Sequence, residues 1–155
     1  MATAIVVYDA WYGCTKTVAE EVARGLSADG RVATVVANVK TVSPRQVLTH
    51  DVIVVGSPNR GGGPTQRVRR LLEVLREVDL RRRRFAFFET CWGPAHGRAV
   101  GKMEAILRDR NPFVFPSFMS LSVALLGPRG PIRPGGLSQC YALGKSIRTG
   151  LAIPA

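Results

Sequence analysis

The chain has 155 residues, 46% of them hydrophobic, which is enough for one full hydrophobic core and too few for two, so we expect a single domain over residues 1–155. No apolar run approaches the roughly 20 residues that span a bilayer, and no basic leader with a cleavage site precedes the first strand pattern, which predicts a cytoplasmic protein without membrane insertion. The formal net charge of +11 favours acidic partners and leaves contact with nucleic acid as a less favoured alternative.

Strand-like and helix-like patterns alternate from the start of the chain. Residues 4–8 form an apolar run of strand length. The next segment places Val18, Val22 and Leu26 at four-residue spacing, which predicts one apolar face of a helix packed on a sheet. Residues 32–39 are rich in β-branched side chains and predict a second strand.

The middle of the chain repeats this alternation. Ser43-Pro44 begins a brief helical turn, and residues 51–57 follow as a third strand. A helix is predicted beyond the glycine-rich loop at 61–64, because apolar side chains recur on one helical face at Val68, Leu71, Leu72, Leu75 and Val78.

The last third of the chain supplies two more strands and two more helices. Residues 85–88 carry aromatic side chains at adjacent positions, as expected of a central strand with helices on both faces. A helix is predicted over 98–110, a fifth strand with a trailing loop over 113–126, interrupted by Pro116, and a final helix over 137–151.

Three of the strands share one arrangement, in which the strand ends in a polar loop with glycine and a helix pattern begins directly afterwards. The loops are residues 9–16, 56–64 and 89–97. In an open parallel sheet, loops at the carboxyl ends of neighbouring strands meet at one crevice, where helix N-termini present unpaired N–H groups to anions. The pattern therefore predicts a site for a phosphorylated ligand.

The first loop decides between the common doubly wound folds. It contains one glycine, whereas a dinucleotide-binding unit needs G-x-G-x-x-G at this point, and the P-loop pattern G-x-x-x-x-G-K-[ST] occurs nowhere in the chain. The remaining familiar arrangement is the flavodoxin-like one, a three-layer sandwich with a five-stranded parallel sheet in the order 2-1-3-4-5 and FMN beside the first strand.

The sequence carries a matching family resemblance. Residues 5–16, IVVYDAWYGCTK, resemble the opening of the flavodoxin family, whose phosphate loop commonly runs S/T-x-T-G-x-T before a helix. Gly13 and Thr15 keep that pattern, whereas Ala10, Tyr12 and Cys14 depart from it, so that backbone N–H groups must supply more of the phosphate contacts.

The resemblance extends along nearly the whole chain. Residues 54–65, VVGSPNRGGGPT, are similar to the G-S/T-P-x-x-x-G loop of flavodoxins and flavodoxin-like quinone reductases, and the likeness continues through 87–93 and, loosely, 127–135. The resemblance implies an FMN-binding domain that passes electrons to a redox partner protein.

The same resemblance implies a set of cofactor-binding residues in the three loops. Backbone N–H groups between Tyr12 and Thr15, with charge from Lys16, would hold the phosphate at the positive end of a helix dipole. Trp92, with Trp11 or Tyr12, would form walls for the flat isoalloxazine ring. The full expected set is Ala10, Trp11, Tyr12, Gly13, Cys14, Thr15, Lys16, Ser57, Pro58, Asn59, Arg60, Gly61, Thr90, Cys91, Trp92 and Gly93.

Two other functions stay open at this stage. One is an NAD(P)H-dependent quinone-type flavin reductase, and the other is a flavin-free interaction module with a basic surface that contacts acidic proteins or nucleic acid. We expect no dedicated catalytic residue and no metal site. His96 is a candidate proton donor for a reductase but, in a Pro-Gly loop, is more typical of a solvent-facing side chain.

The remaining chemistry-bearing residues have two readings each. Glu89 is either a flavin neighbour or a helix-start carboxylate. The three cysteines predict reduced thiols, with a Cys14–Cys91 redox pair as the less favoured reading. The Arg81–Arg84 run predicts a solvated connection at the end of the sheet opposite the crevice.

Overall fold

The computed structural model describes residues 1–108, 113–114 and 120–151. Strands and helices alternate as predicted, and among the helices in those ranges none is long and apolar enough to cross a membrane. The strands are β1 (Ala2–Tyr8), β2 (Val32–Asn38), β3 (Val52–Pro58), β4 (Arg84–Cys91), β5 (Phe113–Val114) and β6 (Leu121–Ala124). The helices are α1 (Cys14–Ser27), α2 (Pro44–Val47), α3 (Gln66–Leu75), α4 (Arg98–Arg108) and α5 (Gly136–Leu151).

The strands form one parallel sheet in the order β2-β1-β3-β4-β5, with β6 also paired to β4. This is the predicted doubly wound order 2-1-3-4-5. The order reverses at β1, so the loops after β1 and β3 leave the same edge of the sheet on either side of a crevice.

Several boundaries differ from the predicted ones. β1 begins at Ala2, and α3 ends at Leu75, so Val78, which was predicted on the apolar face of that helix, lies beyond it and is exposed. β4 continues through Glu89, Thr90 and Cys91 because Glu89 and Thr90 pair with β3 on one side and all three pair with β6 on the other. The fifth position of the sheet is filled by two segments, since β5 pairs with the start of β4 and β6 with its end. Residues 115–119, which include Pro116, and the predicted end of the fourth helix at 109–110 lie outside the described residues.

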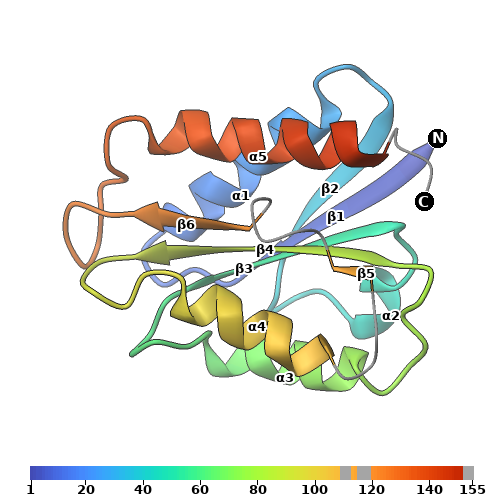
Figure 1. Ribbon diagram of the computed structural model, residues 1–155, viewed down its shortest axis with the longest axis horizontal. Helices are drawn as coiled ribbons and strands as arrows, with labels where there is room; N and C mark the ends of the chain where they lie inside the picture. Colours follow the sequence, from blue (N-terminus) through green and yellow to red (C-terminus); the bar gives the residue numbers. More distant parts are fainter. Residues whose placement is uncertain (109–112, 115–119, 152–155) are drawn as a thin grey trace.

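Helices cover the two faces of the sheet, giving three layers (Figure 1). One face packs against α1 and α5, and the other packs against α2, α3 and α4. Alternate residues along each strand supply the two cores: Val6, Val54, Ala86 and Phe88 face α1 and α5, whereas Ile5, Val7, Ile53, Val55, Phe85 and Phe87 face the other layer. The adjacent aromatic residues of β4 therefore do fill both faces, as predicted.

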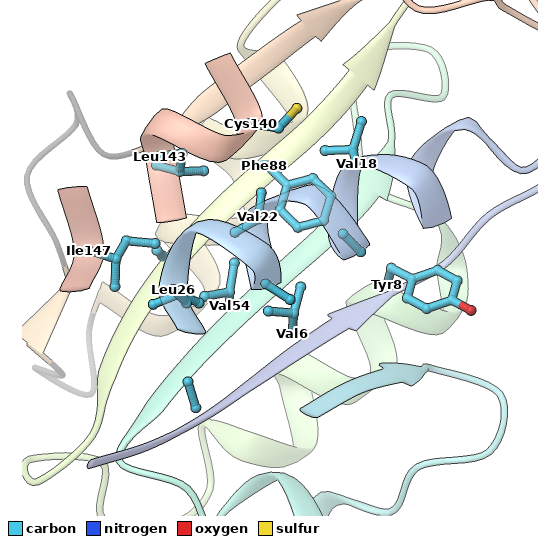
Figure 2. Close-up of a cluster of buried hydrophobic side chains, with 14 of the residues drawn as sticks. Val6, Tyr8, Val18, Val22, Leu26, Val54, Phe88, Cys140, Leu143 and Ile147 are labelled. Carbon is cyan, nitrogen blue, oxygen red and sulfur yellow. The ribbon is translucent and has the colours of Figure 1, made fainter. Parts of the chain in front are cut away.

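Helix α1 is held between the sheet and α5. Figure 2 shows Val22 and Leu26 of α1 near Val6 of β1, with Leu143 of α5 nearby. The two helices approach closely because Gly25 and Gly144 face each other's backbones, and a Cβ at either position would collide with a carbonyl oxygen of the other helix. The contact holds the carboxyl-terminal part of α1 directly against α5.

Candidate functional site

A pocket lies at the carboxyl edge of the sheet, where the loops after β1, β3, β4 and β6 meet. Its volume is about 130 Å³ and it opens to solvent. Its lining comes from all four loops: Trp11, Tyr12, Cys14, Thr15, Pro58, Asn59, Arg60, Thr90, Trp92, Leu125, Pro128 and Arg129. The first three loops are those that the sequence predicted to converge.

The first loop ends in a helix N-terminus with free donors. Gly13 is the N-cap residue of α1 in a left-handed conformation, with φ of 90°, and no side chain caps this helix. The N–H groups of the first turn have no acceptor within the helix. Apart from the chain neighbours Tyr12 and Cys14, no residue lies within 4 Å of the position of a Cβ at Gly13.

A hydroxyl pair joins this helix start to the third loop. Thr15 and Thr90 are both buried, and their Oγ1 atoms lie 2.9 Å apart. Thr15 belongs to the first turn of α1 and Thr90 to the end of β4. The hydrogen bond therefore joins α1 and β4 where both line the pocket.

The second loop is held by the side chain of Asn59. Its Nδ2 donates to Glu89 Oε2 at 2.9 Å and to the Ala95 carbonyl oxygen at 2.7 Å, and its Oδ1 accepts from the Gly62 N–H at 2.9 Å. The amide of Asn59 is thus fully engaged within the protein. It orders the loop over residues 59–62 and ties it to the loop after β4.

Glu89 is the centre of this network and is completely buried. Besides Asn59, its carboxylate accepts from Ser122 Oγ and from the Val100 N–H, each at 3.1 Å. The bond to the first turn of α4 supports the reading of Glu89 as a helix-start carboxylate. His96 is exposed and joins the network through Ser122 Oγ, 3.1 Å from its Nδ1, outside the pocket lining.

A second buried carboxylate stands directly behind the first loop. Asp9 Oδ2 accepts from Thr65 Oγ1 at 2.7 Å, while Oδ1 accepts no hydrogen bond from the described residues and lies 3.6 Å from Nη1 of Arg67. Thr65 also caps α3, and its N–H donates to Ser57 Oγ at 2.9 Å. The buried network links the loops after β1 and β3.

Two arginines lie on the aromatic residues of the first loop. The Arg60 guanidinium carbon is 3.9 Å from the centroid of the Trp11 ring, and that of Arg129 is 4.9 Å from the centroid of the Tyr12 ring. Such cation–π contacts hold a planar cation flat on a ring. They place two positive charges at the mouth of the pocket.

The structure brings many of the expected cofactor-binding residues into the lining and leaves others beside it. Ser57 and Cys91 are buried in the strands below, and burial, followed by the nearby Glu89 carboxylate, raises the pKa of the Cys91 thiol. Ala10 is half-buried against the α1–α5 core. The others are exposed in the loops or in the first turn of α1, outside the lining: Gly13, Lys16, Gly61 and Gly93.

One part of the lining was not predicted from the sequence, namely Leu125, Pro128 and Arg129 after β6. A usable signal was present, because the predicted fifth strand ended near this loop and a parallel strand delivers its carboxyl end to the same edge. The Cys14 thiol donates to the Arg129 carbonyl oxygen at 3.6 Å and so contacts this fourth loop. Cys14, Cys91 and Cys140 are all free thiols.

Comparisons with solved structures agree with this architecture. A flavodoxin from the domain Archaea matches with a TM-score of 0.81 at 22% identity over 97% of this chain and 99% of its own. Flavodoxin 1 from Bacillus cereus matches with 0.79 at 18% identity over 99% and 100%, and a WrbA-like flavodoxin from Agrobacterium tumefaciens with 0.78 at 16% over 98% and 98%. No family model and no curated protein sequence matches the chain. The protein therefore has the flavodoxin-like fold.

Proposed function

We propose that the protein binds FMN at this pocket and passes electrons between partner proteins. The observation that carries the proposal is the start of α1, where free N–H groups and an open glycine stand next to a pocket lined with flat aromatic residues. The three free thiols favour work in a reducing compartment, the cytoplasm. The excess of positive charge favours a partner with an acidic surface.

The donors at the first loop fit the phosphate of FMN. A phosphate monoester carries nearly two negative charges at pH 7, and helix N-termini bind such groups through backbone N–H groups and the helix dipole. Thr15 supplies a hydroxyl group, and Lys16 and Arg129 supply nearby positive charge. The hydroxyl side chains that flavodoxins commonly carry are replaced here by Ala10 and Tyr12, so the main chain does most of the holding.

The aromatic residues fit the isoalloxazine ring. Trp11 and Trp92 come from different loops, and both remain more than half exposed. The pocket volume of about 130 Å³ is below the roughly 300–1,000 Å³ of sites that enclose a ligand of this size, so the ring would lie partly in the open between the loops. Bound FMN supplies reversible one- and two-electron chemistry. An exposed ring edge suits transfer to another protein.

The composition of the lining favours an electron carrier over a reductase with its own acid or base. Within the described chain, no His, Asp or Glu lines the pocket, and these are the usual general acids and bases. The alternative, an NAD(P)H-dependent quinone-type flavin reductase, is therefore less favoured, and turnover of a quinone with NADPH tests it.

The test begins with the visible spectrum of the purified protein, followed by titration of the apoprotein with FMN. We expect a flavin spectrum or saturable binding at micromolar FMN. A colourless protein that ignores FMN at this concentration contradicts the proposal.

A matched pair of glycine variants locates the site. Gly13 and Gly30 flank α1, and both have a left-handed conformation, with φ of 90° and 77°, and open space at the Cβ position. Gly13→Ala and Gly30→Ala therefore introduce similar backbone strain at opposite ends of one helix. We expect Gly13→Ala to weaken FMN binding at least tenfold and Gly30→Ala to leave it unchanged. Equal affinities in the two variants would place the phosphate elsewhere.

A further inference from the structure

We propose that the crevice edge of the sheet is a docking surface for a partner protein with an acidic surface. The surface consists of Arg60, Arg98, Lys102 and Arg129 around the exposed rings of Trp11 and Trp92. The inference rests on the proposed function, because a partner seated here would meet the exposed edge of the flavin. It adds the location of the interface and the chemistry that selects the partner.

The charge at this edge is almost entirely positive. The loops after β1, β3, β4 and β6, over residues 9–13, 59–65, 92–97 and 125–135, contain one acidic residue, Asp9. Asp9 is completely buried, as is Glu89 in the strand below. Neither carboxylate reaches the surface, so the arginines and lysine of the edge face solvent without acidic neighbours from these loops.

The helix N-termini at this edge add to the positive potential. None of the described helices has an acidic residue in its first turn, and α4 begins with Arg98 itself. Negative side chains are the favourable choice at a helix N-terminus, because the dipole is positive there. At α4 the buried carboxylate of Glu89 takes this place through its bond to the Val100 N–H, so the departure is clearest at α1, whose start has neither an acidic residue nor a side-chain cap. Such departures are expected where a surface serves binding.

The cations are also crowded over the glycine-rich second loop. A Cβ at Gly63 would lie 3.5 Å from Nη2 of Arg69 and 3.6 Å from Nζ of Lys102, and one at Gly62 would lie 3.5 Å from Cδ of Arg98. Because these glycines have no side chains, three long basic side chains gather on one turn. Like charges this close repel one another, and an anionic partner relieves that repulsion.

The aromatic residues favour a protein over a nucleic acid as the partner. Trp11 is 53% exposed, Tyr12 51% and Trp92 58%, and aromatic residues with arginine are the residue types that dominate the energetics of protein interfaces. Single-stranded nucleic acids stack their bases on free aromatic faces. Arg60 and Arg129 already cover a face of Trp11 and of Tyr12.

The experiment measures electron transfer in the FMN-loaded protein by stopped flow. The probe is a plant-type ferredoxin, an acidic protein of low potential, which is reduced first and then mixed with the oxidised flavoprotein. The test variant is Arg98→Glu/Lys102→Glu, which lies outside the pocket lining. The control is Arg31→Glu/Arg82→Glu, which makes the same change in net charge before β2 and β4, at the far end of the sheet.

We expect the bimolecular rate of the unaltered protein to fall as salt is raised, because the attraction is screened. The rate at low salt should drop at least tenfold in Arg98→Glu/Lys102→Glu and less than twofold in the control. Equal losses in both variants, or a rate that does not depend on salt, would overturn the docking surface. So would a single-stranded DNA 20-mer that binds more tightly than ferredoxin and loses its binding in the test variant only.

Failure of the docking surface can be told apart from failure of FMN binding. The anisotropy of fluorescently labelled ferredoxin, titrated with apoprotein, reports docking without any flavin. Loss of this binding in Arg98→Glu/Lys102→Glu alone supports the surface even if the protein proves to be colourless. Unchanged FMN affinity in the same variant shows that the cofactor pocket is intact.

Discussion

Basic residues lie at both ends of the sheet, and their side chains make different contacts at the two ends. At the amino end, Arg31 and Arg148 both pair with Asp29 at 3.3 Å, Arg81 pairs with Asp79 at 2.8 Å, and Arg83 donates to the Leu48 carbonyl oxygen. These basic side chains form ion pairs and hydrogen bonds within the protein, so their role is structural.

At the crevice end, the basic side chains lie on aromatic rings and glycine turns instead. The two carboxylates available there, Asp9 and Glu89, face inward. Glu89 accepts from hydroxyl, amide and N–H donors, whereas Asp9 accepts from the Thr65 hydroxyl and lies 3.6 Å from the Arg67 guanidinium. The basic residues behind the high net charge therefore do not all serve the same role. The charges at the amino end meet acidic groups and carbonyl oxygens, whereas several at the crevice end lie on rings and glycine turns, so the two ends should respond differently to mutation.

The largest effect on stability is expected from the buried carboxylate of the crevice end. Glu89→Leu leaves donors of Asn59, Ser122 and Val100 without an acceptor, which should lower the free energy of unfolding by about 3–5 kcal/mol. Urea denaturation measures the change. Glu89→Gln, which keeps the size of the side chain and one carbonyl oxygen, should lose less, and equal losses would show that the remaining acceptor oxygen contributes nothing.

The second-largest loss of stability is expected from Thr65, which links the loop after β3 to the loop after β1. Thr65→Val removes the hydrogen bond to Asp9 and the cap of α3, so we expect a loss of about 2 kcal/mol in the free energy of unfolding. Ser43→Ala, which removes the cap of α2 and touches no buried carboxylate, should lose about 1 kcal/mol in the same assay. If the two losses are equal, Asp9 contributes nothing through Thr65.

Substitution of Arg83 tests whether the basic side chains at the amino end of the sheet stabilise the fold. Its Nε and Nη2 donate to the Leu48 carbonyl oxygen at 3.0 and 2.8 Å, and Arg83→Gln should lower the free energy of unfolding by about 1–2 kcal/mol. The adjacent Arg82 is exposed, and Arg82→Gln should change stability by less than about 0.5 kcal/mol. A reversed order would contradict the division between the two ends.

Arg60 is the matching test at the crevice end. Arg60→Gln removes the cation from the Trp11 ring, which should lower the free energy of unfolding by only about 0.5–1 kcal/mol, because the contact is exposed. Tryptophan fluorescence should change at the same time, since Trp11 is one of two tryptophans. A loss larger than that of Arg83→Gln would mean that the crevice cations are structural as well.

The smallest effect is expected from the exposed pair of Arg81 and Asp79. The pKa of Asp79 is lowered from its ordinary value of 3.8 to about 2, chiefly by the hydrogen bond from the Arg81 side chain. The pair therefore stabilises the fold above pH 3.8 and loses this contribution as the pH falls through 2. NMR titration of Asp79 in Arg81→Gln should show its pKa return towards 3.8. An unchanged pKa would exclude the pair as its cause.

The fold could be predicted from local patterns because its cores follow the alternation of the strands. Val6 and Phe88 face one helical layer, and their neighbours Val7 and Phe87 face the other, so continuous apolar runs indicated a sheet covered on both sides. The division of the fifth position between β5 and β6 could not be predicted, because it depends on which ends of β4 those segments pair with.

The site was predictable at the level of loops and less so at the level of side chains. Strand ends located the first three loops, but the register of β3 and β4 decides which side chains face the pocket. Ser57 and Cys91 turn inward, and the Asn59 amide turns to Glu89. The burial of Asp9 and the participation of Arg129 depend on contacts with residues far away in the sequence, which a local pattern does not contain.

The paired glycines between α1 and α5 have a consequence for how the pocket adapts to a ligand. Gly25 and Gly144 bring two backbones into direct contact, and side chains that could slide or change rotamer are missing from that contact. Helix α1, whose first turn lines the pocket, is therefore held rigidly against α5. We therefore expect the loops around Trp11 and Trp92 to change conformation when a ligand or partner binds, while helix α1 keeps its position.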